Sequence, residues 1–305
     1  MAEGWLRRIK NLWNAGEPQT INSPAAATAG VPEAAETTTA AAPNPPPETT
    51  AAAVLDSERT QVEPLRYEWH GLTDTGMVRP QNEDSFSGIV LGKWSLFAVA
   101  DGMGGHDAGE VASRIAVETV CREIGEGMRE NHQTLLSLIQ HAVQRANSAV
   151  NKEGTSRRSN MGTTLCLALV NDNTAYVANV GDSRAYWIEN GALTQITRDH
   201  SLVAQLVAAG ELTKEEARNH PRSNVLYHTI GNTENIEVDT FQVNLKRGGT
   251  LLLCTDGLWG EMSDEDINRI VSSGADARTA AENLVQAAKA NGGKDNITTV
   301  AIRVL

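Results

Sequence analysis

Four aspartates stand where short apolar segments begin or end, and their repetition is the strongest chemical signal in the sequence. They are Asp101 after residues 97–100, Asp182 after residues 177–180, Asp256 after residues 251–254 and Asp295 before residues 297–302. Glycine lies beside three of them, and it lets the backbone turn sharply and leaves a carbonyl oxygen free to coordinate a cation. Because strand ends on one rim of a sandwich converge, these carboxylates are expected to meet in one cleft.

These residue types point to hard divalent cations. Carboxylate, carbonyl and water oxygens suit magnesium and manganese, whereas a clustered set of histidines and cysteines, which would indicate zinc, is missing from the sequence. A single Asp-Gly pair is more typical of a hairpin turn. Four aspartates at strand ends, joined by Glu83 and Asp84, instead predict a metal site.

Composition limits the classes of protein that this chain can belong to. With 305 residues, 40% of them hydrophobic, the chain can bury a substantial core. The formal net charge of −12 argues against nucleic acid as the main partner. It does not argue against phosphorylated substrates, because bound cations make a carboxylate cluster locally positive. Without an apolar stretch of about 18 residues or a signal-peptide pattern, the protein is expected to be soluble and not secreted.

The three cysteines, Cys121, Cys166 and Cys254, lie far apart with no Cys-x-x-Cys pair. They suggest neither a zinc knot nor a disulfide framework, and they fit a reducing cytoplasm. None has an arginine six positions later, which excludes a thiol-dependent phosphatase. A P-loop and the kinase signature motifs are also missing from the sequence.

The elements that must position the aspartates follow from the hydrophobic pattern. Strands are predicted over residues 67–73, 85–90, 95–100, 163–170, 175–180, 183–188, 237–243, 250–254 and 298–304. Helices are predicted over residues 108–124, 133–151, 264–271 and 277–290. Strands come in clusters and helices in pairs, so the pattern favours an α+β fold of two packed antiparallel sheets flanked by helices.

Three segments are expected along the chain. Residues 18–64 are rich in Ala, Thr, Pro and Glu and are predicted to be a disordered linker. Residues 1–17 carry an apolar stripe opposite a basic side, which predicts an amphipathic helix that contacts a membrane surface or a partner; a frayed end is the alternative. Residues 65–305 are expected to form the globular domain.

Six short motifs stand in an order that resembles the protein phosphatase 2C (PPM) family, in its bacterial branch. They are residues 79–84 (RPQNED), 101–105 (DGMGG), 161–164 (MGTT), 181–184 (GDSR), 255–257 (TDG) and 294–296 (KDN). The resemblance runs from about residue 67 to the end of the chain. It implies a four-layer α-β-β-α sandwich.

The resemblance also implies roles for the acidic residues. Asp101 would bridge two cations, either manganese or magnesium, the Gly102 carbonyl would serve the first, and Asp256 and Asp295 would hold the second. Glu83 and Asp84 would act through bound waters or support the ligands from behind. Asp182, together with Asp256, would match a weaker third cation site.

The activity implied is hydrolysis of phosphoserine and phosphothreonine in proteins by a water activated between two cations. Arg79 and Asp101 would be catalytic, with the Arg79 guanidinium gripping the phosphate; a surface ion pair is the alternative for Arg79. Eukaryotic relatives have a histidine where this chain has Met103, which leaves the proton donor to the leaving group unassigned. His106 and a metal-bound water are the candidates, and a structural loop role is the alternative for His106.

Residues 202–210 and 213–219 resemble the mobile flap of this family, and they are expected to tune substrate access unless they only pack. His200, His220 and His228 are expected to be structural. Two other functions stay open, a non-catalytic phosphoprotein-binding regulator on the same fold and a hydrolase of small phosphate esters.

The resemblance extends to partners and location. The expected partners are phosphorylated proteins that are substrates of eukaryotic-like serine/threonine kinases, which places the protein in signal transduction. A monomer in the cytoplasm is expected, with residues 5–13 bringing it to the membrane periphery or to a partner.

Overall fold

The computed structural model describes residues 66–105, 107–130 and 134–305, all of which belong to one unit, Thr60–Leu305. The expected helix in residues 1–17, the expected linker in residues 18–64 and His106 therefore lie outside the described residues. The predicted segment boundaries at residues 17 and 64 stay predictions.

The described chain builds two antiparallel sheets. The five-stranded sheet has the order β1 (Tyr67–Asp74), β11 (Ile297–Val304), β10 (Thr250–Cys254), β7 (Arg184–Glu189) and β8 (Ala192–Gln195). The six-stranded sheet has the order β2 (Asp84–Leu91), β3 (Trp94–Met103), β5 (Leu165–Asn171), β6 (Thr174–Val180) and β9 (Asp239–Asn244), and β4 (Gly162–Thr163) pairs with the end of β3. Short turns, which antiparallel pairing allows, join three neighbouring pairs: β2 with β3, β5 with β6, and β7 with β8.

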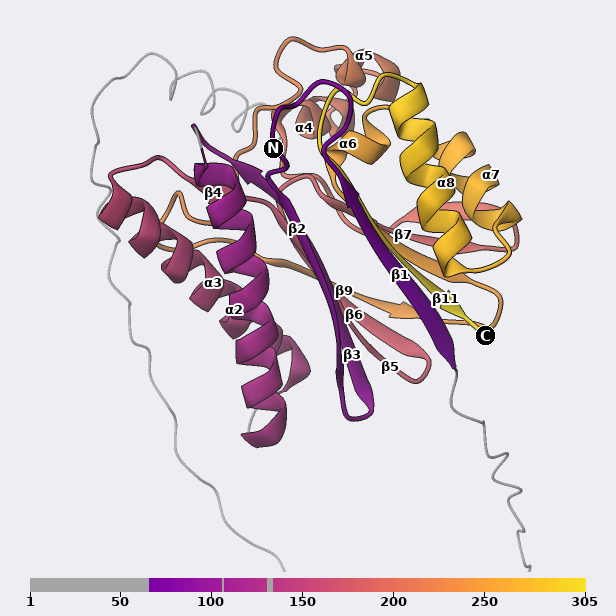
Figure 1. Ribbon diagram of the computed structural model, residues 1–305, viewed down its shortest axis with the longest axis horizontal. Helices are drawn as coiled ribbons and strands as arrows, with labels where there is room; N and C mark the ends of the chain where they lie inside the picture. Colours follow the sequence, from indigo (N-terminus) through magenta and orange to yellow (C-terminus); the bar gives the residue numbers. More distant parts are fainter. Residues whose placement is uncertain (1–65, 106, 131–133) are drawn as a thin grey trace, which may run out of the picture. The chain divides into compact units, whose positions relative to one another are not determined.

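Helices cover the outer face of each sheet (Figure 1). The long helices α2 (Ala108–Glu130) and α3 (Leu135–Arg157) share a buried cluster with β3 and β5. Helices α7 (Asp264–Ser273) and α8 (Ala277–Ala290), with the short α6 (Asp256–Trp259), share another with β10 and β11. The predicted four-layer α-β-β-α sandwich is confirmed.

Successive side chains of a strand point to opposite faces of the sheet, and here both faces are covered. In β3, Phe97 and Val99 face the core between the sheets, whereas Leu96, Ala98 and Ala100 face α2 and α3. A strand that is covered on both faces needs apolar residues at every position, and β5 has such a run.

Several boundaries differ from the predicted ones for identifiable reasons. The strand predicted over residues 163–170 is interrupted at Thr164, whose hydroxyl accepts a hydrogen bond from the backbone of Asp101 instead of extending a ladder. Helix α2 continues through Gly125 and Gly127 to residue 130, because packing against α3 offsets the weak helix propensity of glycine. Strand β8 was not predicted, since it is a four-residue edge strand of which two residues are exposed.

The pairing register places the acidic residues on one rim. Asp84, the first residue of β2, lies opposite Asp101 near the end of β3. Cys254, just before Asp256, lies opposite Thr299, close to Asp295 at the start of β11.

Among the described residues, no helix is long and apolar enough to cross a membrane.

At this rim α6 and the start of β11 approach so closely that only glycine fits at position 257. A Cβ on Gly257 would overlap the backbone carbonyl oxygen of Asn296. We expect Gly257→Ala to lower the free energy of unfolding by about 1–3 kcal/mol, because a backbone atom cannot move aside as a side chain can. Chemical denaturation would measure this.

The matched control is Gly125→Ala, where the added Cβ would lie 3.6 Å from Leu91 Cδ2, an ordinary contact. This variant should be more stable than the parent by about 0.5–1 kcal/mol, because alanine favours a helix interior. Equal stability of Gly257→Ala and the parent protein would contradict the close approach.

Candidate active site

The interruption between β4 and β5 holds Asp101 in place. Its backbone N–H donates to Thr164 Oγ1 at 2.9 Å, and its carbonyl oxygen accepts from Thr163 Oγ1 at 2.8 Å and from the Thr164 N–H at 2.9 Å. Beside it, the Gly102 N–H donates to the Glu83 carbonyl at 3.1 Å, and a Cβ on Gly102 would overlap the backbone of Gly109. Backbone contacts therefore fix the position of the DGMGG turn.

Asp84 is almost fully buried, and its carboxylate accepts a hydrogen bond from Thr255. The Thr255 hydroxyl donates to Asp84 Oδ2 at 2.8 Å and accepts from the Thr298 N–H at 3.0 Å. Thr255 precedes α6 but does not cap it with its side chain. The other oxygen, Asp84 Oδ1, is buried without a partner among the described residues, and the same holds for Asp256 Oδ1.

Asp295 lies in a direct ion pair with Arg79, whose Nη2 is 2.7 Å from Asp295 Oδ2. Asn296 connects the two loops that carry this pair: its Oδ1 accepts from the Glu83 N–H at 2.8 Å, and its Nδ2 donates to the carbonyls of Thr75 and Gln81. The sequence motif includes Asn296, but only its long-range contacts give it a positioning role.

Two further residues hold the loop of Asp182, and the sequence analysis did not identify their role. The Trp259 indole N–H donates to the Asp182 carbonyl at 3.1 Å, and the Gly181 N–H donates to His200 Nδ1 at 3.3 Å. His200 Nε2 lies 3.5 Å from Asp239 Oδ2, which orients the ring. His200 was expected to be structural, and its contact makes it a support of the rim. Its position beside Asp199 at the start of the flap was the only available signal.

The rim carries an excess of negative charge. Burial raises the pKa of Asp84, Asp101 and Asp182 well above the usual range, and neighbouring carboxylates raise it further. Burial and the charge of Asp295 raise the pKa of Asp256 to about 6. Burial also raises the pKa of Glu83.

This donor set fits divalent cations. The groups are hard oxygen donors, two of the buried oxygens have no partner, and repulsion among the carboxylates falls when a cation lies between them. In residues 66–105, 107–130 and 134–305, no three acidic, histidine or cysteine side chains converge on a single point. The rim therefore suits divalent cations by the type of its donor atoms and by its negative charge. Its side chains are not arranged in a complete coordination sphere.

The proton donor to the leaving group stays unassigned. Met103 ends β3 and pairs with Gly162, and its thioether cannot donate a proton. His106 lies outside the described residues.

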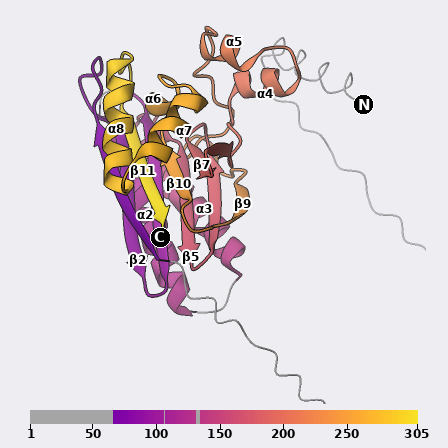
Figure 2. The same cartoon turned by 90° about the vertical axis from the view of Figure 1, so that its right-hand side faces the viewer.

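A cavity of about 530 Å³ opens beside Asp182 and Asp256, between the sheets and the flap. The flap contains α4 (Leu202–Ala208) and α5 (Lys214–Arg218), which lie beyond one end of the sandwich (Figure 2). Both ends of the flap meet at His200 and Ser201, since the Tyr227 N–H donates to the His200 carbonyl and Ser201 bridges Leu226.

Comparison with known proteins agrees with this arrangement. The sequence profile described as protein phosphatase 2C matches residues 79–298. The chain is 38% identical over 239 residues to the serine/threonine phosphatase stp of Listeria monocytogenes, covering 75% of this chain and 93% of that protein. It is 36% identical over 234 residues to the protein phosphatase PhpP of Streptococcus pneumoniae, covering 76% and 95%.

Solved structures give the same result. The serine/threonine phosphatase PstP/Ppp of Mycobacterium tuberculosis superposes with a TM-score of 0.71 at 34% identity, over 78% of this chain and 98% of that one. The catalytic domain of PstP in complex with two manganese ions superposes with a TM-score of 0.70 at 33% identity, over 79% and 99%. The resemblance of the six motifs is thereby confirmed: this chain belongs to the protein phosphatase 2C family.

Proposed function

We propose that this protein hydrolyses phosphoserine and phosphothreonine in other proteins with two divalent cations held at the acidic rim. The observation that carries the proposal is the gathering of buried carboxylates with unpartnered oxygens at one rim of the sandwich. Membership of the protein phosphatase 2C family supports the same reaction.

The residues of the rim divide into ligands and supports. Asp101 and the Gly102 carbonyl would hold one cation, and Asp101, Asp256 and Asp295 the other. Glu83 and Asp84 would act through bound waters or support these ligands from behind, and Asp182 would share a weaker third cation with Asp256. Manganese is supported by the manganese-bound relative, and magnesium suits the same oxygen donors. Bound cations would lower the pKa of a water molecule and would offset the negative charge on the phosphoryl oxygens.

Arg79 would bind the phosphate with its cationic side chain. Its side chain is 46% exposed, and its Nη2 contacts Asp295, so its other N–H groups remain available for phosphoryl oxygens. A planar fork with several donors matches this geometry better than a lysine ammonium does.

A non-catalytic regulator on this fold is the alternative function. Such a protein would not need ligands for cations, whereas Asp101, Asp256 and Asp295 are all present in this chain. The relatives that match most of the chain are named as phosphatases, which favours the enzyme.

The proposal extends to partners and location. The substrates would be proteins phosphorylated by eukaryotic-like serine/threonine kinases, so the enzyme would reverse kinase signalling. It would act as a monomer in the cytoplasm, and residues 5–13 would bring it to a membrane surface or a partner.

The first prediction concerns activity. With manganese, the protein should release phosphate from a phosphothreonine peptide, and excess EDTA should abolish this release. Asp256→Asn in manganese should lower kcat/KM by about 10²-fold or more, because it removes a charged cation ligand. Phosphate release by the parent protein that persists in EDTA would rule out metal dependence, and no release with manganese or magnesium would favour the non-catalytic regulator.

The second prediction concerns stability without metal. A carboxyl whose folded pKa is raised opposes folding above its unfolded pKa, so part of the stability of the EDTA-treated protein should be lost as the pH rises from about 4 to about 6. Asp256→Asn removes this charge and should raise the unfolding free energy at pH 7.5 by about 1–3 kcal/mol. Thermal unfolding with EDTA would measure the gain.

The control for this prediction is the same pair of proteins in saturating manganese. There the parent should gain more stability than Asp256→Asn does, because it keeps the ligand. A metal-free Asp256→Asn protein that is less stable than the parent would contradict repulsion at the rim.

The third prediction concerns Arg79. Arg79→Ala should lower kcat/KM for a phosphothreonine peptide by about 10²-fold in saturating manganese, and Arg79→Lys should recover only part of this loss. A manganese titration of each variant separates weakened cation binding from weakened phosphate binding. Activity of Arg79→Ala within about twofold of the parent would reduce Arg79 to a surface ion pair.

A further inference from the structure

The cavity under the flap has two chemically different walls. One wall belongs to the sandwich and carries Arg184, Asp199 and Trp259; the other belongs to the flap helices, where a group of apolar side chains lies beside Gln205, Lys214 and Arg218. Because Asp182 and Asp256 also line the cavity, it is continuous with the rim where we place the reaction.

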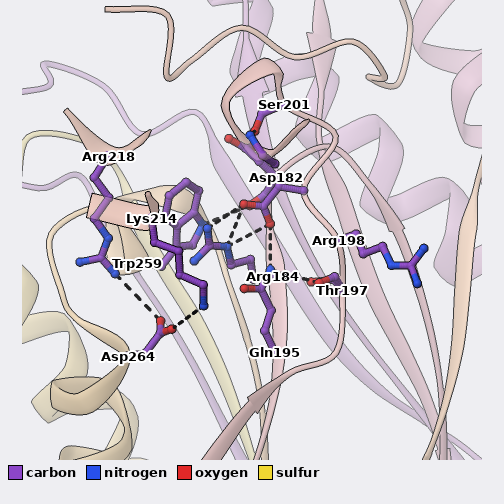
Figure 3. Close-up of polar contacts among 12 residues, drawn as sticks. Asp182, Arg184, Gln195, Thr197, Arg198, Ser201, Lys214, Arg218, Trp259 and Asp264 are labelled. Carbon is purple, nitrogen blue, oxygen red and sulfur yellow. Dashed lines mark hydrogen bonds and ion pairs between the residues drawn. The ribbon is translucent and has the colours of Figure 1, made fainter. Parts of the chain in front are cut away.

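On the polar wall, Arg184, Asp199 and Gln195 contact one another (Figure 3). The Arg184 guanidinium makes bonds of 2.7–3.1 Å to the Asp199 carboxylate and lies 3.7 Å over the Trp259 ring. Gln195 Nε2 donates to the same carboxylate at 3.0 Å. Because this ion pair is largely buried, Arg184 and Asp199 leave little unpaired charge for a ligand at their part of the wall.

The flap wall presents apolar side chains from both helices. Val203, Ala204, Val207 and Ala208 come from α4, and Ala217 comes from α5. Water in contact with such a wall is displaced favourably by an apolar group. The interior of the cavity therefore suits an aliphatic side chain better than a charged one.

The mouth of the cavity is cationic. Lys214 Nζ and Arg218 Nη2 lie 3.7 and 4.0 Å from the Asp264 carboxylate, which are long distances for ion pairs, and both point toward it in Figure 3. Lys214 is 79% exposed. Two cations share one carboxylate here, so an acidic group on a bound segment would be attracted to this edge.

We propose that this cavity is a specificity pocket that takes an aliphatic side chain of the substrate protein, with an acidic neighbour at Lys214 and Arg218. The phosphorylated residue of the same segment lies at the carboxylate rim, so this inference rests on the proposed phosphatase function. The flap then selects substrates by sequence near the phosphorylated residue.

Steady-state kinetics in manganese test the pocket. The parent peptide has one phosphothreonine flanked by alanines, and a series places one leucine at each position within four residues on either side. Leucine at a favoured position should raise kcat/KM by roughly tenfold over the alanine peptide, the scale that an apolar pocket provides. An aspartate beside that leucine should add a further gain of about threefold, and Lys214→Ala should remove it.

Ala204→Phe fills the pocket and should abolish the gain from leucine while the alanine peptide is hydrolysed within about twofold of the parent rate. Ala209→Phe is the matched control, because Ala209 is exposed at the end of α4 and does not line the cavity. It should keep the gain. Ala208→Phe, at an exposed lining position, replaces Ala204→Phe if thermal unfolding shows that the latter is misfolded.

The result that overturns the pocket is a leucine series with no favoured position, or a gain that survives in both filled variants. Failure of the proposed function looks different, since no peptide would then be hydrolysed. In that case methyl NMR tests whether the pocket binds leucine. An unphosphorylated leucine peptide should shift the methyl signals of Val203 and Val207 in the parent protein and not in Ala204→Phe. Unchanged signals in the parent overturn the proposal.

Discussion

Repulsion among carboxylates at one rim of the sandwich is the constraint to which the surrounding structure responds. Apart from the Arg79–Asp295 ion pair, the bonds that hold this rim are neutral: a threonine hydroxyl donates to the Asp84 carboxylate, and hydrogen bonds to their backbones hold Asp101 and Asp182. Neutral hydrogen bonds fix position without removing charge, so the rim keeps its affinity for cations. Rigid strands and close glycine contacts resist the separation that repulsion favours.

Much of the fold could be predicted, because hydrophobic periodicity reports how many faces of an element are buried. The fully apolar β5 and the paired long helices indicated two sheets with helices outside. The full length of α2 could not be predicted from the sequence, because Gly125 and Gly127 suggest the end of a helix. Packing against α3 offsets the low helix propensity of these glycines. Edge strand β8 and the single turn α6 are too short for periodicity to reveal.

The candidate site divides in the same way. The aspartates were visible because each follows or precedes an apolar strand, which is a local property of the sequence. The roles of Thr255, His200 and Trp259 depend on partners far away in the chain, and no local pattern specifies such a pairing. The lining of the cavity could not be predicted for the same reason. The apolar residues of the flap line a cavity only because Arg184 and Asp199, from another part of the chain, lie opposite them.

The ion pair between Arg79 and Asp295 joins the side chain that we propose binds phosphate to a carboxylate that we propose binds a cation. A cation that binds Asp295 competes with the guanidinium for the same carboxylate and so frees it to face the substrate. Thermodynamic linkage makes this effect reciprocal: a phosphate that draws Arg79 away must tighten cation binding by the same factor. The enzyme would therefore bind its divalent cations and its substrate cooperatively, and the cellular level of those cations would affect its apparent affinity for phosphoproteins.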